Sequence, residues 1–128
     1  LAVFCAIVIT AMTYSWIKSD SWIGSESENH TLEYKLNSSS AEKGDATAQF
    51  NLGLSYYNGQ GVGVDKEMAF GLFLKGAERG VEVSQFSVAS MLYHGDGVKV
   101  DKATSKMWFE KAAAQGSEEA RKYLEAWV

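Results

Sequence analysis

The segment NGQGVGVDK, residues 58–66, carries the residue types most able to do chemistry, with three glycines in five positions followed by Asp65. A glycine-rich loop can cradle a phosphate, but this requires Lys-Ser or Lys-Thr after the last glycine, or a strand before the first. Neither is present. A calcium loop requires alternating carboxylates that end in a bidentate glutamate, and Asn58, Gln60 and Asp65 do not supply that pattern. The segment therefore predicts a turn between two helices.

The other chemistry-bearing residues do not form a catalytic set. His94 and Asp96 could provide half of a metal site, but no second histidine stands near them in the sequence. No Ser/His/Asp set, metal cluster or carboxylate pair falls on one predicted face, as an active site would require. The sequence therefore predicts a non-enzymatic protein with no catalytic residue, no metal and no cofactor, and a hydrolase associated with the cell envelope is the alternative. A formal net charge of −4 without a run of Lys or Arg also argues against nucleic acid as a partner.

The glycine segment belongs to an internal repeat. A shift of 36 positions places NGQGVGVDK (58–66) on HGDGVKVDK (94–102). Three related tetrapeptides mark the same boundary in successive units, namely AEKG (41–44), AERG (77–80) and AAQG (113–116). A fixed period of this size is the signature of a stacked repeat array.

Each unit predicts two helices, because apolar residues recur at helical spacing. The helices are expected at about 46–58, after 65, and at 82–94 and 102–115. Asp45, Asp65 and Asp101 are expected N-caps, and Gly59 is expected to end the first helix in the left-handed conformation.

The same periodicity predicts which side chains are buried. The expected inward positions are Ala48, Leu52, Tyr56, Ala69, Leu72, Phe73, Ala77, Val88, Leu92, Trp108, Phe109 and Ala113. Four loop valines are expected to fill the gap between the helices of each pair, namely Val62, Val64, Val98 and Val100.

The two ends of the array are predicted half-repeats, because two whole repeats cannot cover their own outer faces. Residues 31–43 align with a second helix, with Leu36 at the position of Leu72, although the run NSSS predicts a short or frayed element. Residues 116–128 align with a first helix that Ser117 caps. The repeat domain is expected to span 31–128, with full repeats at 44–79 and 80–115.

These residues resemble the Sel1-like repeat family, a relative of the tetratricopeptide repeats. The first repeat matches the family pattern at Ala48, Leu52, Gly53, Tyr56, Gly59, Gly61, Val62, Asp65, Ala69, Lys75, Ala77 and Gly80. The second matches it at Gly95, Gly97, Val98, Asp101, Trp108, Lys111, Ala112, Ala113 and Gly116. The departures are Leu72 for an aromatic residue, Ala89 for glycine, Leu92 for tyrosine and Ser105 for alanine.

The resemblance implies an all-α fold, a short right-handed α/α solenoid of two full helix-pair repeats with flanking half-repeat helices. It also implies a role as a protein–protein adaptor. Some members of the family are disulfide-rich secreted proteins with β-lactam binding or hydrolysis, a branch that depends on paired cysteines. Cys5 is the only cysteine of this chain and lies outside the repeats, so that activity is not carried over.

The first seventeen residues, LAVFCAIVITAMTYSWI, carry no charge and are mostly apolar. This length suits a short membrane-spanning helix and exceeds the core of most signal peptides. Residues 1–17 are therefore expected to form an apolar helix that anchors the chain in a membrane, or a cleaved signal segment. Residues 18–30 are an expected flexible polar linker, and the repeat domain is expected outside the bacterial cytoplasm, membrane-anchored or secreted.

In helix-pair solenoids the first helices line the concave surface. The residues left on this surface after the buried positions are removed predict a groove for a protein or peptide, at Asn51, Ser55, Ser87, Met91, His94, Tyr123 and Trp127. Two alternatives remain open: Met91 and Trp127 close the core at the C-terminal end, or Tyr123 and Trp127 stack on a carbohydrate such as peptidoglycan. The oligomeric state is not predicted.

Overall fold

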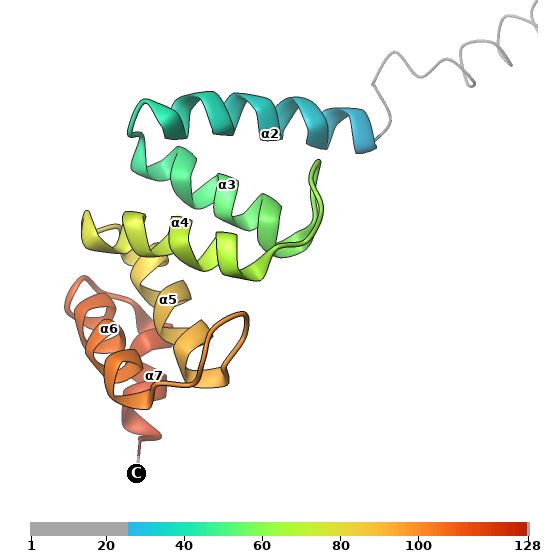
Figure 1. The fold of residues 1–128 in the computed structure, drawn as a ribbon. Coiled ribbons are helices and arrows are strands. Elements are labelled where there is room, and N and C mark those ends of the chain that lie inside the picture. The colour runs from blue at the N-terminus through green and yellow to red at the C-terminus, as the bar shows by residue number, and fades with distance from the viewer. Residues whose placement is uncertain (1–25, 128) are drawn as a thin grey trace, which may run out of the picture.

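The computed structural model describes residues 26–127, which form six helices and no strand. The helices are α2 (Glu26–Glu42), α3 (Ala46–Asn58), α4 (Lys66–Glu78), α5 (Glu82–His94), α6 (Lys102–Ala114) and α7 (Glu118–Glu125). Figure 1 shows them stacked in chain order, with each helix packed on the next. The predicted all-α solenoid is confirmed, with α3–α4 and α5–α6 as its two helix pairs and α2 and α7 at its ends.

The expected apolar helix of residues 1–17 lies outside the described residues. Within 26–127, no helix combines the length and the apolar character that crossing a bilayer requires.

Side-chain caps fix where four of the helices begin. Asp45 accepts from the backbone N–H groups of α3, and Asp65 and Asp101 do the same for α4 and α6 at 3.0 and 3.1 Å. Ser117 accepts from the first turn of α7. All four predicted caps are confirmed, and each satisfies backbone donors that a helix N-terminus leaves without a partner.

The glycine segment is a turn, as predicted. Gly59 and Gly95 end α3 and α5 in the left-handed conformation, with φ of 72° and 69°. The chain then returns, and the N–H of Asp65 donates to the carbonyl of Tyr56 at 2.8 Å. The expected burial of the loop valines is wrong for Val64 and Val100, which are 63% and 49% exposed. These side chains lie against Gly59 and Gly95.

The second glycine of each loop seats one repeat on the preceding one. Gly61 and Gly97 have φ of 74° and 73°, and a Cβ atom on Gly97 would collide with Lys66 at the start of α4. A Cβ atom on Gly61 would collide with the carbonyl of His30 in α2, which is 36 positions before Lys66. Figure 1 shows the loop after α3 reaching back beside α2. The repeats therefore approach to backbone contact at one recurring place.

A second recurring contact between repeats comes from buried glutamines. The side-chain amide of Gln49 donates to the carbonyl of Ala41 at 3.4 Å, and that of Gln85 donates to the carbonyl of Ala77 at 3.2 Å. Each glutamine therefore ties a first helix to the end of the preceding second helix, where carbonyl groups lack intrahelical partners.

The two interfaces differ at one register position. The side-chain amide of Gln115 donates to the Gln85 side-chain oxygen at 2.7 Å, so both polar groups of the Gln85 amide have a hydrogen-bond partner. Arg79, 36 positions earlier, turns to the carbonyl of Gly44 instead. The side-chain oxygen of Gln49 is consequently buried without a hydrogen-bond partner among the described residues.

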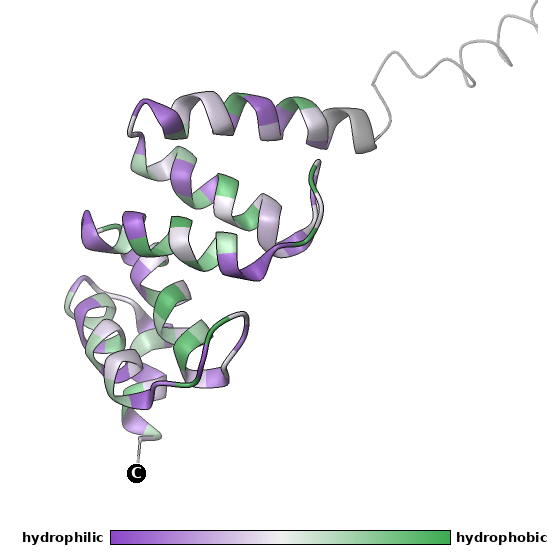
Figure 2. Ribbon diagram, in the orientation of Figure 1, coloured by the Kyte–Doolittle hydropathy of each residue, from purple (hydrophilic) through white to green (hydrophobic). Residues whose placement is uncertain are grey.

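The larger core cluster draws its buried residues from α4, α5, α6 and α7. Phe73, Val88 and Phe109 are almost fully buried there, and Figure 2 shows apolar stretches along α4 and α5. A smaller cluster of Ala41, Ala48, Leu52 and Leu72 lies under α2. The predicted inward positions are buried, except that Tyr56 and Ala113 are half-buried.

Two expectations for the N-terminal half-repeat are wrong. α2 is a 17-residue helix that continues through NSSS, and it already begins at Glu26, inside the expected flexible linker. The packing of Tyr34 on Tyr56, with ring centroids 5.9 Å apart, holds it in place against weak local propensity. Leu36, expected at a buried position like that of Leu72, is 62% exposed because no described helix covers this side of α2.

The seating of the loop predicts the effect of a single methyl group. Gly97→Ala is expected to destabilise the domain by about 1–3 kcal/mol, because alanine strains a positive φ and the new Cβ collides with Lys66. Gly63→Ala is the matched control, since nothing lies within 4 Å of a Cβ there and its φ is not positive. Urea unfolding of both variants measures the difference, and equal stability would contradict the seating.

Candidate binding groove

Two adjoining depressions lie over the first helices. The larger has a volume of about 440 Å³ and is lined by Leu54, Tyr57, Phe73, Phe86, Ser87, Ser90, Met91, His94, Gly95 and Asp96. The smaller, of about 340 Å³, is lined by Phe50, Glu82, Val83, Phe86, Ser87, Ser117 and Glu119. Because Phe86 and Ser87 line both, the depressions adjoin along α5, and the two together are called the α5 groove below.

Helical spacing places the walls of the α5 groove. Phe50, Leu54 and Tyr57 recur at i, i+4 and i+7, so α3 presents all three on one side. Phe86 forms the central wall and packs on Phe109 with ring centroids 5.7 Å apart. The groove is therefore mainly apolar along its length, with polar groups at its two ends.

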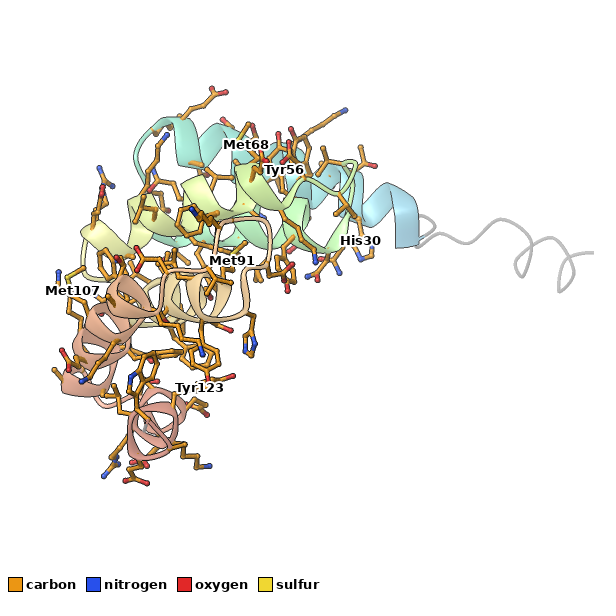
Figure 3. The ribbon with its side chains drawn as sticks, turned by 60° about the horizontal axis from the view of Figure 1, so that its bottom comes forward. His30, Tyr56, Met68, Met91, Met107 and Tyr123 are labelled. Carbon is orange, nitrogen blue, oxygen red and sulfur yellow. The ribbon has the colours of Figure 1, made fainter. Side chains whose placement is uncertain are left out.

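Three of the sequence-predicted site residues line the α5 groove, namely Ser87, Met91 and His94. The Ser87 hydroxyl donates to the carbonyl of Val83 at 2.8 Å, so it is satisfied within its own helix. Met91 is only 4% exposed and belongs to the core, and in Figure 3 it lies among the helices whereas Met107 lies on the outside of α6. His94 is exposed at the rim.

Asn51 and Ser55 lie apart from both depressions. Ser55 is 5% exposed, and its hydroxyl donates to the carbonyl of Asn51 at 3.2 Å. Asn51 is half-buried. Their place in a binding site stays a prediction.

Tyr123 and Trp127 pack on the C-terminal end of the core. Tyr123 stacks on Phe109 with ring centroids 4.6 Å apart, and its hydroxyl is 3.2 Å from Nε2 of His94. Trp127 contacts Tyr93 edge-on at 5.4 Å. Both rings are half-buried, so they cover the core and leave only part of their surface for a partner.

A polar cluster that the sequence analysis missed forms one rim of the α5 groove. Asp96 accepts from Nζ of Lys66 at 2.6 Å and from the hydroxyl of Tyr57. These two donors, Lys66 first, lower the pKa of Asp96 below its ordinary value. The cluster joins the loop of the second repeat to the first repeat. The sequence signal that could have revealed it is the recurrence of a Tyr–Lys pair, Tyr57 with Lys66 and Tyr93 with Lys102, at the repeat spacing.

The carboxylate of Asp96 is therefore already engaged by a cation and a hydroxyl, which disfavours the half-site for a metal considered for His94 and Asp96. Among residues 26–127 no group of three or more His, Cys, Asp or Glu side chains is arranged to hold a metal ion. At the opposite end of the groove, Glu82 and Glu119 provide two carboxylates.

The family pattern of the Sel1 repeat matches residues 46–81 and 83–117, which together are more than half of the chain. The chain therefore belongs to the Sel1 repeat family. Sel1 repeat proteins are in general protein-interaction modules, and the repeat is typically a non-catalytic scaffold. No curated protein matches the chain in sequence.

Three solved structures show the same fold. A Sel1 repeat protein from Oxalobacter formigenes is 35% identical over 67% of this chain and 25% of its own, with a TM-score of 0.65. The protective antigen c5321 of uropathogenic Escherichia coli, which displays an SLR fold, is 31% identical over 89% of this chain and 24% of its own, with a TM-score of 0.71. Cysteine-rich protein B of Helicobacter pylori is 26% identical over 70% and 68%, with a TM-score of 0.67. The chain spans about a quarter of the first two proteins.

The rim cluster predicts an acid-sensitive contribution to stability. A carboxylate whose pKa is lowered by folding stabilises the fold above its ordinary pKa, and this stability is lost as pH falls through the lowered value. Asp96→Asn is therefore expected to reduce the thermal midpoint at neutral pH. The gap to the unmodified chain should begin to narrow near about pH 4 and close only below the lowered pKa of Asp96. Circular dichroism melts from neutral to acid pH measure both. A gap that is independent of pH would contradict the role given to Asp96.

Proposed function

We propose that this domain is a non-enzymatic interaction module that binds a short segment of a partner protein along the α5 groove. The observation that carries the proposal is that the two depressions adjoin over one helix and share Phe86 and Ser87 in their lining. The general role of Sel1 repeats in protein interaction supports it.

The dimensions of the groove suit an extended segment. α5 has 13 residues, or about 20 Å at 1.5 Å per residue, which an extended chain covers with about six residues. The larger depression, of about 440 Å³, falls within the range of about 300–1,000 Å³ typical of ligand pockets. Its apolar lining favours one or two apolar anchor side chains from the partner.

The charges at the two ends of the groove favour a partner segment with a basic residue at one end. Glu82 and Glu119 line the smaller depression, so a Lys or Arg of the partner is favoured there. At the other end Asp96 is already paired with Lys66, which leaves that rim less acidic. The proposed ligand is therefore a segment with an apolar anchor and a basic residue several positions away.

We further propose that residues 1–17 tether this module to a membrane, with the repeats outside the cytoplasm. The uncharged, apolar sequence of this segment supports the tether. Fractionation of cells that express the full chain is expected to place it with the membranes, and removal of residues 1–25 is expected to release it. Recovery of the full chain in the soluble fraction would contradict the tether.

Peptide display against the domain, followed by fluorescence anisotropy with the selected peptides, tests the groove. Ser87→Arg places a long cation between the two depressions and is expected to weaken binding at least roughly tenfold, because it blocks the shared wall and repels the basic residue. Ser39→Arg is the matched control, since Ser39 is an exposed residue of α2 and lines neither depression.

Both variants should keep the thermal midpoint of the parent chain. Selected peptides that combine apolar and basic residues, and that bind Ser39→Arg normally, would support the proposal. Peptides whose affinity is the same for Ser87→Arg and the parent would overturn the placement of the ligand in the α5 groove.

A further inference from the structure

The two repeats carry the same pair of side chains at the rim. Lys66 lies over the ring of Tyr57 with Nζ 5.0 Å from the ring centroid. One repeat later, Lys102 lies over the ring of Tyr93 with the same separation of 5.0 Å. The 36-residue register relates both members of the pair, so the structure contains two copies of one Tyr–Lys arrangement.

The first copy holds a carboxylate. Nζ of Lys66 donates to Oδ1 of Asp96 at 2.6 Å, and the Tyr57 hydroxyl donates to the other carboxylate oxygen. The two donors therefore grip both oxygens of one carboxylate, which arrives on the loop seated against Lys66 at Gly97. Charge-assisted bonds to both oxygens make this a selective arrangement for an anion of that shape.

The second copy has its donors free within the described part of the chain. Lys102 is exposed and Tyr93 is half-buried, and no hydrogen bond joins either side chain to a residue within 26–127. The neighbouring Asp101 carboxylate is committed to Thr104, accepting from its backbone N–H at 3.1 Å and its hydroxyl at 2.7 Å. Asp65 likewise caps α4 beside the first Tyr–Lys pair, and that pair still binds the Asp96 carboxylate. A capping Asp next to the pair therefore does not prevent carboxylate binding.

The ring of Tyr93 is held in place by aromatic residues of α6, of α7 and of the segment after α7. Trp127 and Tyr123 contact it edge-on, with ring centroids 5.4 and 5.5 Å away, and Phe109 contacts it at 6.4 Å. The phenol is therefore oriented before any ligand arrives, which reduces the entropy lost on binding.

We propose that Tyr93 and Lys102 form a binding subsite for a carboxylate group of a partner protein chain, gripped as Tyr57 and Lys66 grip Asp96. The ligand is an Asp or Glu side chain or a chain-terminal carboxylate carried on an exposed loop or tail. This subsite lies one repeat beyond the rim of the α5 groove and does not depend on occupation of that groove.

The internal copy supplies the probe. A peptide with the sequence of residues 93–102, acetylated and amidated at its ends, carries the loop that docks on the first pair. Titration into the isotope-labelled full chain is expected to shift the Tyr93 ring and Lys102 side-chain resonances saturably at millimolar peptide. The same peptide with Asp96→Asn is expected to bind roughly fivefold more weakly, as is usual for loss of an exposed charge pair.

Matched protein variants locate the effect. Lys102→Met and Tyr93→Phe are each expected to weaken binding of the Asp-containing peptide, and Tyr93→Phe keeps the aromatic packing of the ring. Lys106→Met removes another exposed lysine from the same helix and is expected to leave binding unchanged. The thermal midpoints of all three variants show whether the fold is intact.

The proposal would be overturned by equal binding of the Asp and Asn peptides, by equal effects of Lys102→Met and Lys106→Met, or by no shift of the Tyr93 ring at millimolar peptide. Acetate serves as the free-carboxylate arm, and a terminal-carboxylate arm uses the same peptide with Asp96→Asn and its C-terminus left unblocked. Acetate binding as tight as the Asp peptide would limit the subsite to small carboxylates and overturn its assignment to a protein partner. If this unblocked peptide binds more tightly than the blocked Asp peptide, a chain-terminal carboxylate is the ligand.

Discussion

Backbone contact between one repeat's loop and the preceding repeat is the constraint on which the rest of this structure depends. Gly61 and Gly97 carry no Cβ atom, which lets the loop reach His30 and Lys66 in two successive units. A contact this close to the backbone has little tolerance for sliding, and it fixes the offset between helix pairs. That offset brings α3, α5 and α7 to one surface, where the α5 groove forms between them.

The polar contacts between repeats act on the same interfaces. Gln49 and Gln85 bond to carbonyls at the ends of the preceding helices, and Asp96 is gripped by Lys66 and Tyr57. Because Tyr57 and Asp96 also line the groove, the residues that join the repeats are in part the residues that a partner would meet. A ligand in the proposed groove would therefore contact residues that also join the repeats.

Periodicity predicts most of the fold, because a repeat imposes the same helix, cap and turn at each register position. Asp65 and Asp101 illustrate this, since each caps a helix at its expected place. Periodicity does not predict features set by a neighbouring unit. Leu36 has a buried register partner but is exposed, α2 is longer than NSSS suggests, and Asp96 pairs with a residue 30 positions away. Of the predicted site residues, Ser87, Met91 and His94 line the groove, whereas Asn51 and Ser55 do not. The Ser55 side chain is buried and bonded within its own helix, which periodicity alone does not predict.

Native-state hydrogen exchange measures most directly whether the seated loops join the repeats into one unit. The slowest amides of α4, near Phe73, and of α6, near Phe109, belong to different repeats but to one continuous core. If the loop contacts couple the repeats, these amides should share one opening free energy and one dependence on denaturant. Opening of α3–α4 at a clearly lower free energy than α5–α6, with its own denaturant dependence, would contradict that coupling.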